Sequence, residues 1–149
     1  RVRDLRARWA EDVAAHAPAI VSVLIGVNDT WRRYDSDDPT TATDFERDYR
    51  AILDATHEAR LVLIEPFLLP VREAQVSWRT DLEDKIGVVR TLAAERGAVL
   101  VRADLALGAQ RDAAALASDG VHPTAAGHRA LADLWLAAAG GLVRRALLA

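Results

Sequence analysis

The sequence predicts an α/β fold of three layers, in which helices cover both faces of a parallel β-sheet. Short apolar runs rich in β-branched residues, typical of buried strands, occur at residues 20–25, 61–64 and 98–101. Between them lie segments whose apolar residues recur at helical spacing. Because alternating strands and helices are joined by right-handed crossovers, these observations indicate an α/β/α architecture with parallel strands.

The composition indicates a single domain, residues 1–149. This length and a hydrophobic fraction of 51% allow a sizeable core. The formal net charge of -3 gives no reason to expect nucleic acid as a partner. Cysteine is absent, which excludes disulfide scaffolds, thiolate zinc sites and cysteine nucleophiles. No apolar run approaches the roughly 20 residues of a membrane-spanning helix, and cytoplasmic and secreted locations both stay open.

The first part of the chain is predicted to contain a helix, a strand and a loop. Apolar residues at helical spacing predict a helix over residues 2–16. The run at residues 20–25 has the composition of a strand that is buried on both faces. Residues 30–41 are interpreted as a loop, in which Trp31 and Tyr34 either line the mouth of a pocket or pack on the surface.

The middle of the chain is predicted to alternate between helix and strand. Thr43 and Glu46 form a capping box at the start of a helix that precedes the strand at residues 61–64. Residues 67–77 are interpreted as an apolar loop. A long helical stripe follows, and Gly97 stops that helix just before the third strand.

The last part of the chain is predicted to be helical. Asp104 is a candidate cap for a short helix over residues 105–116. Thr124 is a candidate cap for the final helix, in which Leu131, Leu134 and Trp135 recur at helical spacing. The polar turn at residues 118–124 therefore lies directly before a packed helix.

Two polar turns carry the candidate functional residues. Residues 26–29 directly follow the first strand, and open α/β sheets bind ligands at the carboxyl ends of their strands. Asp119 lies three residues before His122, so its carboxylate can hold one ring nitrogen and leave the other free as a base. The alternative is a cap beside a surface imidazole, without catalysis. Asp119 and His122 could also be ligands of a metal-dependent hydrolase.

These two turns, with their flanking residues 23–32 and 118–128, resemble the third and fifth conserved blocks of the SGNH, or GDSL-type, serine ester hydrolases. The likeness is to the bacterial branch that includes acetylxylan esterases. The resemblance implies a flavodoxin-like SGNH fold and catalysis that needs no cofactor. It also implies that the side-chain amide of Asn28 stabilises the oxyanion, that Asp119 and His122 are the acid and base of the triad, and that Asp29 shapes the turn.

The chain departs from the family pattern because it contains no Gly-Asp-Ser block and no second-block glycine. None of its serines, Ser22, Ser36, Ser77 and Ser118, follows a Gly-Asp pair. We therefore expect an N-terminally truncated SGNH-hydrolase-like domain that lacks the first strands and the nucleophile, and is inactive alone. We also expect a bare edge on the first strand, through which the chain aggregates, forms a homo-oligomer or binds the lost strands.

The function expected from the resemblance is hydrolysis of small acyl esters, above all acetyl esters, on carbohydrates by Ser-His-Asp chemistry. The expected partner is a small-molecule or carbohydrate ester. One alternative is a lipid or lysophospholipid acyl hydrolase of the same fold, which acyl-chain profiling would distinguish, since a small pocket prefers acetate over longer chains. Another is a binding module or catalytic remnant in which Asn28, Asp119 and His122 persist without chemistry.

Overall fold

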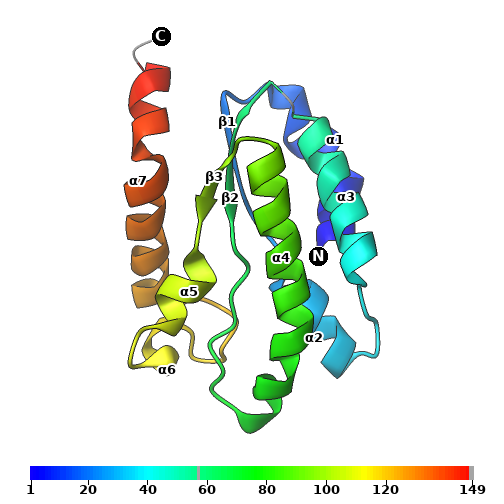
Figure 1. The fold of residues 1–149 in the computed structure, drawn as a ribbon, viewed down its shortest axis with the longest axis vertical. Helices are drawn as coiled ribbons and strands as arrows, with labels where there is room; N and C mark the ends of the chain where they lie inside the picture. The colour runs from blue at the N-terminus through cyan, green and yellow to red at the C-terminus, as the bar shows by residue number, and fades with distance from the viewer. Residues whose placement is uncertain (57, 148–149) are drawn as a thin grey trace.

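A parallel sheet of three strands forms the centre of the computed structural model, which describes residues 1–56 and 58–147 (Figure 1). The strands are β1 (Ile20–Leu24), β2 (Arg60–Ile64) and β3 (Val99–Val101), in the order β1-β2-β3. In the register, Val21 lies opposite Leu61 and Leu63 lies opposite Leu100. The α/β fold with a parallel sheet, predicted from the apolar runs, is confirmed.

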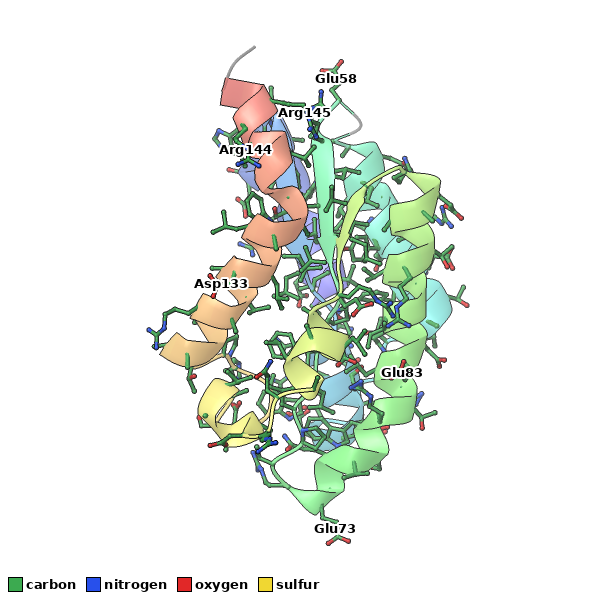
Figure 2. The ribbon with its side chains drawn as sticks, turned by 60° about the vertical axis from the view of Figure 1, so that its left-hand side comes forward. Glu58, Glu73, Glu83, Asp133, Arg144 and Arg145 are labelled. Carbon is green, nitrogen blue, oxygen red and sulfur yellow. The ribbon has the colours of Figure 1, made fainter. Side chains whose placement is uncertain are left out.

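Helices cover both faces of this sheet. On one face lie α1 (Val2–Asp12), α3 (Ala42–Asp54) and α4 (Arg79–Glu95), and α7 (Ala125–Leu147) lies on the other (Figure 1). Figure 2 shows the strands between α7 and α4. The first core contains side chains from the three helices and the sheet, such as Tyr49, Leu53 and Val89, all fully buried. The second core packs Val62 and Val101 against α7.

The carboxyl ends of the strands face a group of short helices. These are α2 (Val27–Asp35), α5 (Ala103–Gly108), α6 (Ala113–Leu116) and the 3-10 helix η2 (Glu73–Trp78), all below the sheet in Figure 1. A second 3-10 helix, η1 (Ala14–His16), completes the first helical segment, which was predicted as one helix. Loops that follow β1 and β2 therefore meet the start of α7 at one end of the molecule.

Strand β1 differs from the prediction that both its faces are buried. Val21 and Val23 are buried against the helices of the first face, but Ser22 and Leu24 are exposed, Leu24 to 40%. The reason is that α7 packs mainly along β3 and reaches β1 through Trp135, whose Nε1 donates to Ser22 Oγ, so this face of β1 is only partly covered. Within the described residues β1 pairs only with β2, so the sheet has the free edge that was expected there.

The predicted loop at residues 30–41 is partly helical. The helix α2 begins immediately after Gly26, with Thr30 N–H donating to the carbonyl of Gly26. The acidic stretch after Tyr34 concealed this helix, and its buried residues, Asp29 and Thr30, are polar rather than apolar. The cap of α3 was also misplaced: Thr41, not Thr43, accepts a hydrogen bond from Asp44 N–H at 3.0 Å.

The segment at residues 105–116 is two short helices rather than one. Asp104 is not a cap, because it lies inside α5, where its buried carboxylate forms an ion pair with Arg79. The cap predicted at Thr124 is confirmed, since its hydroxyl accepts from Gly127 N–H at 3.2 Å and donates to the carbonyl of Ala115 at 2.6 Å. Among the described helices, none has the length and apolar character needed to cross a membrane.

Candidate active site

The Asp119–His122 pair forms as the spacing predicts. Asp119 Oδ2 lies 2.6 Å from His122 Nδ1, and Asp119 Oδ1 accepts from the backbone N–H groups of Val121 and His122 at 2.9 and 2.8 Å. A carboxylate can only accept hydrogen bonds, so Nδ1 of His122 carries a proton and donates it. In the neutral ring the other nitrogen, Nε2, is then the acceptor, and the side chain is 64% exposed.

The same hydrogen bonds control the ionisation of Asp119. Partial burial would raise the pKa of this carboxyl, but the hydrogen bonds from the His122 ring and from two backbone N–H groups outweigh it. The resulting pKa of Asp119 is about 2. The side chain is therefore an acceptor-only carboxylate at neutral pH, as the proposed orientation of the ring requires.

This pKa predicts an acid-dependent loss of stability. Because the pKa is lower in the folded state, the Asp119 carboxylate stabilises the fold above its ordinary pKa of 3.8, and this stabilisation is lost as the pH falls through about 2. We expect carbon-13 NMR to show Asp119 titrating near pH 2, and Asp119→Asn to flatten the dependence of unfolding free energy on pH in that window. A titration near pH 4 in the intact chain would contradict the prediction.

A pocket at the carboxyl end of β1 brings Asn28 and His122 together. It has a volume of about 190 Å³ and is otherwise mostly apolar, and its lining includes Val27, Phe67 and Val121. The two polar side chains of the sequence prediction thus open onto one cavity, with Asp119 on the Nδ1 side of the ring. Oδ1 of Asn28 is buried and has no hydrogen-bond partner in the described part of the chain.

Local backbone geometry explains how Asn28 reaches this pocket. Gly26 has a φ of +132°, which turns the chain directly from β1 into α2. A Cβ at this position would lie 3.1 Å from Phe45 and Pro66, so a side chain would be both strained and crowded. Asp29 is fully buried and accepts from Val2 N–H at 3.0 Å, so it joins the start of α2 to the start of α1.

Aromatic rings border the imidazole of His122. Trp31 meets His122 edge to face, with 5.7 Å between ring centroids, and stacks on Trp78 at 6.1 Å. Trp78 in turn stacks on Tyr34 at 5.4 Å. Trp31 and Tyr34 were predicted as either pocket or surface residues, and Trp31 proves to contact the candidate base. Trp78 was missed because no local pattern links residue 78 to the turn at residue 122.

Three of the four serines are hydrogen-bonded to groups outside the pocket. Ser22 Oγ accepts from Trp135 Nε1 at 2.8 Å, while Ser36 and Ser77 donate to Asp35 and to the carbonyl of Ala74. Within residues 1–56 and 58–147, no serine hydroxyl is hydrogen-bonded to the His122 ring. In the same part of the chain, no three His, Cys, Asp or Glu side chains converge as a ligand set, so the metal-dependent alternative gains no support.

A parallel α/β sheet that carries an Asp–His pair and an asparagine on one pocket at its carboxyl edge has the architecture of the SGNH class of proteins. A sequence model of the GDSL-like Lipase/Acylhydrolase family matches residues 1–130, and the chain belongs to this family. The family resemblance inferred from the two turns is confirmed.

Relatives within the family include an acetylxylan esterase of Geobacillus stearothermophilus, which is 37% identical over 145 residues. The match covers 91% of this chain, and the chain spans 65% of the length of that relative. The crystal structure of Axe2, an acetylxylan esterase from the same organism, matches with a TM-score of 0.81 and 35% identity over 91% of this chain and 65% of Axe2. A GDSL-like lipase structure from Parabacteroides merdae matches with a TM-score of 0.86 and 30% identity, over 94% of this chain and 68% of that one.

Proposed function

We propose that this chain provides the acid–base part and one oxyanion donor of a serine ester hydrolase active site. The observation that carries the proposal is that Asn28 and His122 line one pocket while Asp119 Oδ2 lies 2.6 Å from Nδ1 of the His122 ring. In this proposal, residues 1–149 are part of a single SGNH-hydrolase-like domain. The nucleophilic serine comes from residues that this chain does not contain.

The proposed chemistry follows from the orientation of the ring. Nε2 of His122 accepts the proton of the serine hydroxyl while the serine oxygen attacks the ester carbonyl carbon, and a tetrahedral oxyanion forms. The N–H groups of the Asn28 amide donate to that oxyanion. When the intermediate collapses, His122 returns the proton to the departing alkoxide, and water repeats the sequence to release the acid. Asp119 remains ionised throughout and stabilises the imidazolium.

The proposed substrates are small acyl esters, above all acetyl esters, on carbohydrates. Relatives that are named acetylxylan esterases support this choice, since they are 37% and 35% identical to this chain over the aligned residues. The pocket volume of about 190 Å³ suits a short acyl group. Its apolar lining also favours the second candidate, an acyl hydrolase that acts on lipid or lysophospholipid esters.

The test restores a nucleophile and compares acyl chains. We expect the 149-residue chain alone to show no His122-dependent turnover of p-nitrophenyl acetate. A chimera with the Gly-Asp-Ser segment of a family member fused ahead of Arg1 should hydrolyse the ester, and its kcat/KM should be at least tenfold higher for acetate than for octanoate. Preference for octanoate would favour the lipid alternative. An inactive, folded chimera would contradict the proposed catalysis and leave the binding-module reading.

A further inference from the structure

Gln75 connects the loop after β2 with the turn that carries Asp119 and His122. It lies in η2, at the lower end of the molecule, where Figure 2 labels the neighbouring Glu73. The residue is only 2% exposed. Its Oε1 accepts from the N–H groups of Val71 and Arg72 at 2.9 and 3.1 Å, and its Nε2 donates to the carbonyl oxygen of Asp119 at 2.7 Å.

A second contact joins the same two segments. Leu69 N–H donates to the carbonyl of Gly120 at 2.9 Å. Gly120 has a φ of +85°, and a Cβ built there would lie 2.7 Å from the carbonyl oxygen of Leu69 and 2.9 Å from Nε2 of Gln75. The turn is therefore pressed directly against the loop, with no room for a side chain between them.

We propose that Gln75 is a positioning residue for the Asp119–His122 pair, an inference that rests on the proposed function. Gln75 fixes the position of the Asp119 backbone carbonyl. The Asp119 carboxylate accepts from the N–H groups of the second and third residues after it, Val121 and His122. A shift of this peptide group therefore moves the carboxylate relative to the imidazole. Since the carboxylate orients the ring, the position of Nε2 in the pocket depends on Gln75.

Only an amide side chain suits this position. The buried group must accept from two adjacent N–H groups on one side and donate to a carbonyl on the other. Glutamate has the same shape but no donor when it is ionised, and its charge would face the Asp119 carbonyl. Leucine fills a similar volume but leaves all three backbone groups without a partner, which is costly for buried polar groups.

The test compares Gln75→Glu and Gln75→Leu in the 149-residue chain by NMR, with no ester present. We expect the pKa of Asp119 to rise from about 2 toward 3.8 in both variants. We also expect the low-field resonance of the His122 Nδ1 proton to weaken or disappear. A purely structural role would lower the melting temperature without moving either signal. Gln110→Leu is the matched control, because Gln110 is exposed and, among the described residues, its side-chain amide donates only to the carbonyl of Ala106, at 3.5 Å.

The outcomes separate this inference from the proposed function. If folded variants keep the wild-type Asp119 titration and Nδ1 resonance, Gln75 is not a positioning residue. If Gln75→Leu does not fold, Gly120→Ala decides, because its methyl group must displace Gln75 or Leu69. Gln75→Glu is then judged by the Nδ1 resonance alone, since its added negative charge raises the pKa of Asp119 by itself. Shifted signals in a chain whose chimera lacks esterase activity would support the positioning role and contradict only the proposed catalysis.

Discussion

Replacing His122 by alanine in a chimera that carries the nucleophile is expected to lower kcat for p-nitrophenyl acetate by roughly 10⁴- to 10⁶-fold. Without the imidazole no group in the pocket can take the serine proton, because Asn28 is the other polar side chain of the lining and an amide is not a base. The His122 ring is 64% exposed, so its removal should change the melting temperature little. Steady-state kinetics and thermal unfolding on the same samples check both statements.

His128→Ala is the matched control for this prediction. His128 is an exposed histidine in the first turns of α7, and it does not line the pocket. We expect the variant to keep activity within a factor of about two, as is usual for an exposed side chain away from special features. Equal losses in both variants would show that the effect of His122→Ala arises from damage to the start of α7 rather than from loss of a base.

The strands and the Asp119–His122 pair could be predicted because their signals are local. Each strand is a short apolar run, and the pair needs only three residues of spacing and a turn that lets Asp119 accept from the N–H of His122. The helix α2 was missed because its sequence continues into the acidic residues 35–38, whose composition is typical of a loop.

The residues that contact the Asp119–His122 pair from other elements could not be predicted, because they reach it through tertiary contacts. Gln75 donates to Asp119 across 44 residues, and nothing near it in the sequence distinguishes it from a loop residue. The contact between Trp31 and His122 likewise exists only once α2 and the start of α7 meet at the carboxyl edge of the sheet. The glycine at position 120 was the available signal, since a positive φ and a close approach both favour glycine.

Replacing Asn28 by alanine in the same chimera is expected to lower kcat by about 10²- to 10³-fold, which corresponds to about 2.7–4 kcal/mol of transition-state stabilisation. The amide donates to an oxygen whose negative charge develops only as the ester is attacked, so KM should change little. Asn28→Asp should lose at least as much, because the carboxylate has the same shape but no donor and repels the oxyanion.

The split between kcat and KM distinguishes this role from its alternatives. Asn28 lines the pocket beside Gly26 and Val27, so a residue that only shaped the cavity would alter substrate binding and raise KM in both variants. If instead Asn28 merely stabilised the start of α2, both substitutions would lower the melting temperature and leave kcat largely intact in the folded fraction. Loss of kcat at constant KM and constant melting temperature is therefore the result that only an oxyanion donor produces.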